Sequence, residues 1–178
     1  MAVSRRTGWI AAGLLARLLM MAVLLMAVRF VLANYIQWDY TQDPYKLQSY
    51  TYVVASAVVG TAGGLLQIPV AMYLLCKSKR AIPSAIILDI SMHADIVISV
   101  VLASGVGAGF GATNDVLRYV RVTTWEGGEQ AEQALINYYN RAIVPVVFLL
   151  VGMVLSICAT VVSARLRARA TNDSEGGA

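Results

Sequence analysis

The sequence predicts an all-α membrane protein, a bundle of four transmembrane helices with both termini in the cytoplasm. Three observations predict this fold class. Of the 178 residues, 58% are hydrophobic and only 13% are charged, whereas about a quarter of the residues in a soluble domain are charged. The apolar residues form four runs, each at least as long as the roughly 20 residues that a helix needs to cross a bilayer. The basic residues gather at alternate ends of these runs.

The first apolar run covers residues 9–33 and follows a short polar N-terminus, residues 1–8, which carries two arginines. A cleaved signal peptide is the alternative for this segment, because Val-Leu-Ala at its end resembles a cleavage site. The run is much longer than the roughly 7–15 residues of a signal-peptide core, and it contains Arg17. We therefore expect a first transmembrane helix here.

The second apolar run, residues 50–76, contains no charged residue. Ser56, Gly60 and Gly64 recur every four residues, which places small side chains on one helical face and allows another helix to approach closely. The alternative is that glycine is simply common in membrane helices. Pro69 is expected to kink this helix near its end.

The third run covers residues 83–111, and only a short basic turn separates it from the second, so these two helices are expected to be antiparallel neighbours. Near its far end, Gly105 and Gly109 form a further small-residue step that favours helix packing. The glycine spacing there does not match a dinucleotide-binding loop.

The fourth run covers residues 142–164 and is preceded by the longest predicted loop, residues 113–141. Within that loop, residues 129–140 are compatible with a short helix that leads into the membrane. The tail, residues 165–178, carries three arginines and then T-N-D-S-E-G-G-A (residues 171–178), whose composition is typical of a disordered segment.

Basic residues near the ends of the runs predict the orientation of the chain. The N-terminus carries two lysines or arginines, the middle loop three and the C-terminal flank three, whereas the first and third loops are net acidic. Because cytoplasmic loops of membrane proteins are enriched in basic residues, both termini are expected in the cytoplasm. The same grouping at segment ends, in place of a basic stripe, argues against nucleic acid as a partner.

Two charged residues of opposite sign are expected at similar depth in the membrane. Arg17 lies about nine residues into the first helix and Asp95 about twelve into the third, and both helices run in the same direction. An arginine–aspartate pair neutralises both charges where neither can be solvated. We predict that Arg17 and Asp95 form an intramembrane ion pair that joins two helices.

Two more polar side chains in the third run, Asp89 and His93, are one turn apart and share a helical face, while Asp95 points elsewhere. Acidic and histidine side chains inside membranes often relay protons. A small proton-linked channel or transporter that uses Asp89, His93 and Asp95 is therefore an alternative function. We favour a structural role, since only two of the four helices contribute charges.

No sequence motif indicates an enzyme. The chain lacks G-x-S-x-G, H-E-x-x-H and Walker-type motifs, and the lone His93 has no second histidine or cysteine at metal-ligand spacing. We therefore expect no catalytic residue, no bound metal and no cofactor.

Three segments carry a resemblance to a known family. They are L-L-A-R-L-L-M around Arg17, Y-T-Y-V-V-A-S-A-V-V-G-T-A-G-G-L-L-Q-I-P-V-A-M-Y in the second run, and D-I-V-I-S-V-V-L-A-S-G from Asp95. Together they resemble the Casparian strip membrane domain protein-like family of plants, over about residues 13–162. In that family an arginine in the first span and an aspartate in the third are hallmark positions, which correspond here to Arg17 and Asp95.

The resemblance implies a four-helix plasma-membrane protein, related to MARVEL-type proteins, that associates with itself and with related family members. It also implies a non-enzymatic scaffold that organises membrane domains for local cell-wall modification, with the lipid bilayer and cell-wall-modifying enzymes as further partners. The first loop, N-Y-I-Q-W-D-Y-T-Q-D-P-Y-K, lacks the motif E-S-L-P-F-F-T-Q-F of the founding group, and I-V replaces Q-V-M after Asp95. A "like" member with its own scaffold role is therefore expected.

Overall fold

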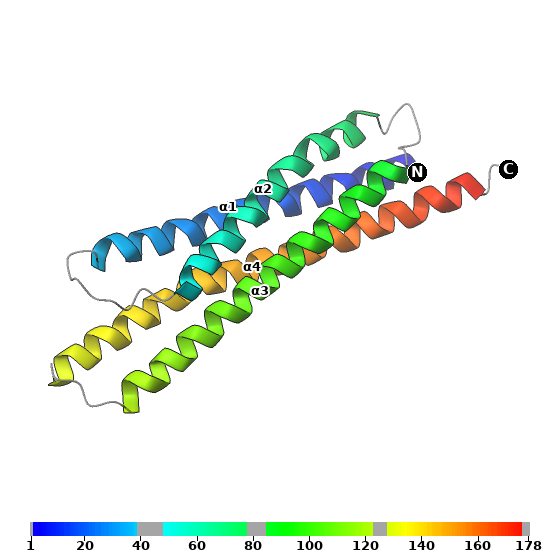
Figure 1. The fold of residues 1–178 in the computed structure, drawn as a ribbon. Coiled ribbons are helices and arrows are strands. Elements are labelled where there is room, and N and C mark those ends of the chain that lie inside the picture. The colour runs from blue at the N-terminus through cyan, green and yellow to red at the C-terminus, as the bar shows by residue number, and fades with distance from the viewer. Residues whose placement is uncertain (1, 39–47, 78–84, 123–127, 176–178) are drawn as a thin grey trace.

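The computed structural model describes residues 2–38, 48–77, 85–122 and 128–175, and every element in these ranges is an α-helix. The helices are α1 (Ala2–Trp38), α2 (Gln48–Lys77), α3 (Ala85–Val122) and α4 (Gly128–Glu175). They run alternately up and down in one elongated bundle (Figure 1). We call the end at which α1 begins and α4 ends the terminal end, and the opposite end the far end.

Each helix contains a stretch long and apolar enough to cross a membrane. The four stretches are Gly8–Ala33, Thr51–Tyr73, Asp89–Val122 and Ile136–Ala168. In such segments the backbone hydrogen bonds must be made internally, and a helix does this within one segment of chain. The predicted all-α fold with four membrane-spanning helices is therefore confirmed.

The helices are longer than the predicted spans, and two sequence predictions were wrong. In the predicted loop 113–141, α3 continues to Val122 and α4 begins at Gly128, so the short helix expected over residues 129–140 is found as the start of α4, whereas residues 113–122 were wrongly predicted as loop. The tail predicted to be disordered is helical up to Glu175. In the first case the reason lies in the packing, since Val120 in the extension of α3 and Tyr139 in that of α4 are both buried. In the tail, extending an existing helix costs far less than starting one.

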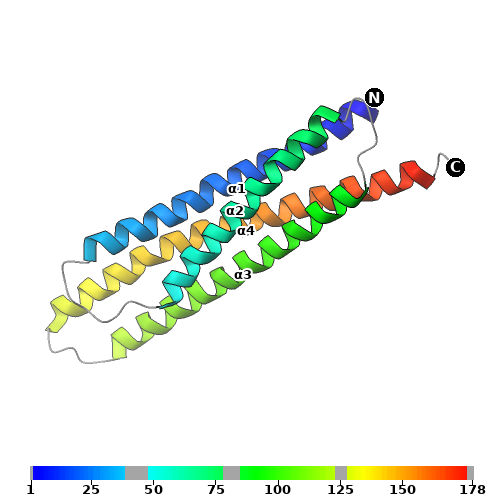
Figure 2. The same cartoon turned by 45° about the horizontal axis from the view of Figure 1, so that its top comes forward.

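The order of the helices around the bundle decides which side chains can meet. α1 packs against α2 and α4, and α3 packs against the same two helices, so α1 and α3 are diagonal partners (Figure 2). The predicted neighbours α2 and α3 do pack together. Any contact between α1 and α3 must therefore be made by side chains that reach across the centre of the bundle.

The centre of the bundle is filled by leucines from three helices and opened by glycines. Leu24, Leu102 and Leu149 are completely buried. A Cβ atom at Gly60 of α2 would lie 2.8 Å from Cδ1 of Leu24 and 2.9 Å from Cδ2 of Leu102. Cores have few voids larger than a water molecule, so a larger residue than Gly60 would force this centre apart.

The other predicted packing residues also face neighbouring helices. A Cβ atom at Gly105 would lie 2.6 Å from the Oγ atom of the buried Ser56, and one at Gly109 would lie 2.8 Å from Val146. At Gly64, such an atom would lie 3.0 Å from side-chain atoms of both Met20 and Met21. The close contacts follow the helical spacing of four residues that the sequence shows.

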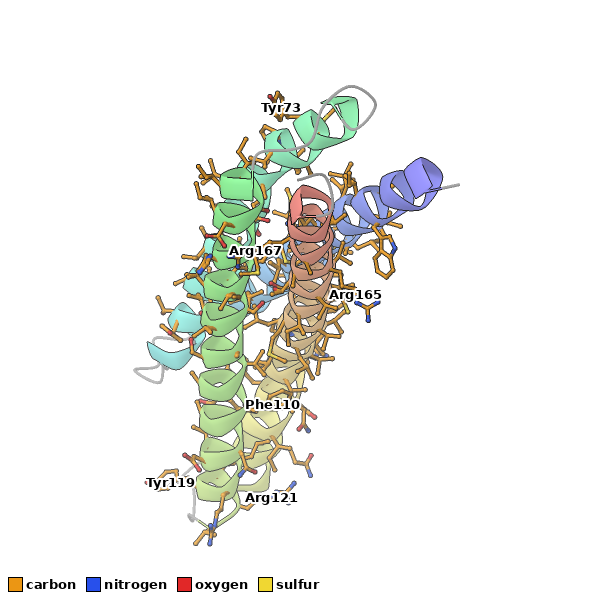
Figure 3. All side chains as sticks on the ribbon, turned by 90° about the vertical axis from the view of Figure 1, so that its right-hand side faces the viewer. Tyr73, Phe110, Tyr119, Arg121, Arg165 and Arg167 are labelled. Carbon is orange, nitrogen blue, oxygen red and sulfur yellow. The ribbon has the colours of Figure 1, made fainter. Side chains whose placement is uncertain are left out.

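Large apolar side chains cover the outside of the bundle, as expected for a surface in contact with lipid. Leu66 is 77% exposed and Ile86 is 69% exposed, and each of the four helices has large apolar side chains exposed. Pro69 lies within α2, and the part of this helix that carries Tyr73 bends away from the rest (Figure 3). A proline inside a helix removes one backbone hydrogen bond and commonly produces such a bend.

Candidate functional site

Arg17 is 7% exposed, and its guanidinium group contacts the carboxylate of Asp95 across the bundle diagonal. The Nη2 atom of Arg17 is 2.6 Å from Oδ2 of Asp95. Arginine is suited to this position, because its long side chain carries the charge from α1 past the core to α3. The contact joins the two helices that do not pack directly on each other.

Two serines complete this contact. Nη2 of Arg17 donates to the Oγ atoms of Ser91 in α3, at 3.2 Å, and Ser163 in α4, at 3.1 Å. The hydroxyl of Ser163 in turn donates to Oδ2 of Asp95, at 2.8 Å. We call Arg17, Ser91, Asp95 and Ser163 the buried polar cluster.

The chemistry of the buried polar cluster is that of a fixed ion pair. Removing two charges from water costs several kcal/mol per ion, and only close contact with additional hydrogen bonds offsets this cost. The serines supply those bonds to both the guanidinium and the carboxylate. Each charge is thus neutralised in place, and the cluster connects α1, α3 and α4.

A second pair of serines extends the polar contact between α3 and α4 toward the far end. The hydroxyls of Ser99 and Ser156 lie 2.9 Å apart, and the hydroxyl of Ser99 also donates to the backbone carbonyl of Asp95. Serine hydroxyls of membrane helices commonly bond across to a neighbouring helix in this way. The seam between α3 and α4 is therefore polar at two successive levels.

The structure does not bring Asp89 and His93 to the buried polar cluster. The carboxylate of Asp89 lies 2.8 Å from Nη1 of Arg167 in α4, and Arg167 is seen between α3 and α4 in Figure 3. Nδ1 of His93 lies 2.8 Å from the backbone oxygen of Asp89, and the His93 side chain is 65% exposed. We call Asp89, His93 and Arg167 the surface polar cluster.

Sequence reasoning missed three members of these clusters, Ser91, Ser163 and Arg167, and only Ser91 had a detectable signal. Ser91 precedes Asp95 by one helical turn, so it must share a face with that aspartate. Ser163 and Arg167 are also one turn apart, and they meet Asp95 and Asp89, which are six residues apart on the antiparallel helix α3. Only the rotation of α4 about its axis, which the sequence does not show, selects these two residues among the polar side chains of that helix.

Among the residues that the structure describes, no group of three or more histidine, cysteine, aspartate or glutamate side chains could hold a metal ion. Cys158 is a free, exposed thiol on α4. The predicted absence of a catalytic residue and of a cofactor stays a prediction.

The chain is therefore a four-helix membrane protein with an arginine–aspartate pair across the diagonal of the bundle. The family model of the Casparian strip membrane protein domain matches residues 6–155, which is most of the chain. The chain therefore belongs to this family, and the resemblance predicted from the sequence is confirmed. The matched region includes Arg17 and Asp95 but ends before Ser163.

One similar protein is CASP-like protein 4D1 of Sorghum bicolor, with 38% identity over 81 residues. The alignment covers 40% of this chain and 42% of that relative, so the chain matches less than half of the relative's length. No solved structure matches this chain.

Proposed function

We propose that this protein is a non-enzymatic scaffold of the plasma membrane, which self-associates into homo- or hetero-oligomers and organises membrane domains for local cell-wall modification. Membership of the Casparian strip membrane protein domain family is the observation that carries this proposal. The geometry is compatible with it, because the charges inside the bundle are bound to each other and the outer faces are apolar.

The proposed orientation places the terminal end in the cytoplasm. Arg165 and Arg167 lie near this end of α4, and the guanidinium carbon of Arg165 lies 5.2 Å from the centre of the Trp9 ring. Tryptophan and arginine are typical of the membrane interface, and basic residues are typical of its cytoplasmic side. An epitope at either terminus is expected to be protected from protease added outside intact cells; cleavage of both would contradict this orientation.

Photobleaching of a fluorescent fusion in the plasma membrane of plant cells tests the scaffold. Scaffold proteins are immobilised by their contacts, so recovery is expected to be slow and incomplete where the fusion accumulates. A single-span marker of similar mass in the same membrane is the control for free diffusion. Recovery as fast and complete as that of the marker, at every location, would contradict the proposal.

Self-association is tested separately in lipid. We expect single fluorescent copies in nanodiscs or bilayers to bleach in two or more steps per spot, because the protein forms oligomers. A labelled membrane protein known to be monomeric gives the one-step control. One-step bleaching over the whole accessible concentration range would leave the proposed oligomer without support.

The proposed association with cell-wall-modifying enzymes rests on family resemblance alone, and proximity labelling from a fusion at the outer side of the membrane tests it.

For the alternative, a proton-linked channel or transporter, no observation among the described residues speaks in favour. Asp95 is bound to Arg17, and His93 faces away from it. We expect proteoliposomes to show no proton flux above that of empty vesicles.

A further inference from the structure

A groove of about 460 Å³ lies between α3 and α4 toward the far end of the bundle. Its volume is within the range of roughly 300–1,000 Å³ that is typical of ligand sites. Two polar residues and four apolar ones line it: Phe110, Gly111, Thr113, Asn114, Leu117 and Ile143. The hydroxyl of Thr113 is bound to the backbone oxygen of Gly109, so the wall of the groove is mostly apolar.

Gly111 keeps this groove open. A Cβ atom at Gly111 would meet nothing within 4 Å, so the packing of the bundle does not require a glycine there. A glycine inside a helix is less favourable than an alanine, because it loses more backbone freedom on folding. The space beside Gly111 is therefore available to a part of another molecule.

Contacts between the helices place the groove at the membrane boundary of the far end. A Cβ atom at Gly109 would lie 3.0 Å from Val53 of α2, so these two residues are at the same level. The apolar stretch of α2 begins two residues before Val53, at Thr51. Beyond this level α3 and α4 continue farther than α1 and α2 (Figure 1 and Figure 2). The groove therefore extends from the apolar interior of the membrane into the headgroup region.

The polarity of α3 changes along the groove in the direction of the bilayer normal. Phe110 lies toward the interior, and the exposed Arg118 and Arg121 follow Leu117, the last lining residue of α3. Figure 3 shows Phe110 and Arg121 on the side of α3 next to α4, and Tyr119 on the opposite side. An apolar wall thus ends at two basic side chains.

These two arginines are available to a ligand. Among the residues that the structure describes, neither Arg118 nor Arg121 has a hydrogen-bond or ion-pair partner. The acidic Asp115, between Asn114 and these arginines in the sequence, does not line the groove. Guanidinium groups bind phosphate oxygens through parallel hydrogen bonds, and basic side chains between membrane helices recognise anionic lipid headgroups. The charge and the apolar wall together match an amphipathic anion.

We propose that this groove binds one anionic phospholipid of the adjacent leaflet. An acyl chain lies against Phe110, Gly111 and Ile143, and Arg118 and Arg121 hold the phosphate. The site requires neither the scaffold role proposed above nor a particular side of the membrane for the far end.

Titration of the full chain in detergent, read by native mass spectrometry, tests the headgroup half of the site. Phosphatidylglycerol is compared with a phosphate-free galactolipid that has the same acyl chains. We expect phosphatidylglycerol to bind about tenfold more tightly, because charge-assisted hydrogen bonds are stronger than neutral ones. The double variant R118Q/R121Q should lose this preference. R29Q is the matched control, since Arg29 is an exposed arginine of α1, which contributes no residue to the groove.

Filling the groove tests its apolar half. We expect G111L to lower the affinity for both lipids by about fivefold, because the leucine occupies the space of the acyl chain. G107L is the matched control, since Gly107 lies one turn away and does not line the groove. Both variants are expected to fold, because a Cβ atom at either position would meet nothing within 4 Å.

Three results would overturn the inference. Equal affinity of the unmodified protein for the two lipids would remove phosphate recognition. A loss of preference in R29Q equal to that in R118Q/R121Q would show that net charge, and not this site, selects the lipid. Unchanged lipid binding in G111L would show that the lipid binds elsewhere and, if the oligomers also become smaller, that a second copy of the chain occupies the groove.

Discussion

The inward and outward faces of α3 carry the same residue types in different surroundings. On the inward face, Asp95 contacts Arg17 at 2.6 Å with almost no exposure of either side chain. On the outward face, Asp89 contacts Arg167 at 2.8 Å with both side chains partly exposed. The two ion pairs are nearly equal in length, so distance does not distinguish them.

The glycines of α3 repeat this contrast. A Cβ atom at Gly105 or Gly109 would overlap atoms of a neighbouring helix, whereas one at Gly107 or Gly111 would meet nothing within 4 Å. Four glycines at spacings of two residues therefore fall alternately on the two faces. Only the inward two are required for helix packing within one copy of the bundle.

Burial, and not residue type, therefore decides how much each contact contributes to the stability of the bundle. A charge left without its partner inside the bundle keeps its full desolvation cost. A charge left alone at the surface is solvated by water or lipid headgroups, and such pairs contribute about 0–1 kcal/mol. Substitutions on the two faces of α3 should therefore differ by several kcal/mol in their effect on the free energy of unfolding.

Removal of either partner of the inward pair should have the largest effect. We expect R17A and D95A each to lower the free energy of unfolding by about 3–5 kcal/mol, because each leaves one buried charge unpaired. Unfolding in mixed detergent micelles measures this quantity. D89A is the control on the outward face. An equal loss of unfolding free energy in D89A and D95A would show that burial does not distinguish the two ion pairs.

Exchange of the two charges tests the pairing itself. We expect the double variant R17D/D95R to be more stable than either single alanine variant, because the charges can pair again across the same diagonal. The exchange is compared with the single variants R17D and D95R in a double-mutant cycle. Additive losses in this cycle would show that Arg17 and Asp95 act independently.

A valine on the inward face of α3 should also destabilise the bundle. We expect G105V to cost about 2–3 kcal/mol, since the new side chain would overlap Ser56 and Leu149. G107V, two residues away, is expected to change the free energy of unfolding by less than about 0.5 kcal/mol. Equal effects at both positions would mean that helix propensity, and not packing, determines the loss.

Removal of one serine hydroxyl tests the hydrogen bonds around the inward pair. We expect S163A to lower the free energy of unfolding by about 1.5 kcal/mol, because the carboxylate of Asp95 loses one donor. T160A is a matched control one turn earlier, since the hydroxyl of Thr160 bonds only to the backbone of Ser156. The two variants should unfold at clearly different denaturant fractions.

The smallest effect is expected at the outward pair. D89N and R167Q should each change the free energy of unfolding by less than about 1 kcal/mol, and high salt should abolish the difference. The same salt should leave the loss in D95A unchanged, because a buried pair is screened much less. A salt-insensitive loss in D89N would place Asp89 in a drier environment than its exposure indicates.

The sequence determined the number and type of the elements and the level of the inward pair. The hydropathy of each segment can be read directly along the sequence, so four apolar runs predict four helices. Depth follows from the rise of about 1.5 Å per residue, which places Arg17 and Asp95 at similar levels. The spacing of Ser56, Gly60 and Gly64 likewise predicts one packed face, because side chains four residues apart lie above one another.

Which side chains meet depends on the tertiary structure, because each helix can rotate about its axis and pack against different neighbours without any change in its sequence pattern. This choice brings Ser163 to Asp95 and Arg167 to Asp89, and it turns His93 outward. It also places α1 and α3 on a diagonal, so that their contact is made by a long side chain. The extension of α3 and α4 beyond the predicted spans depends on contacts between those two helices. It therefore cannot be predicted from the sequence of either segment alone.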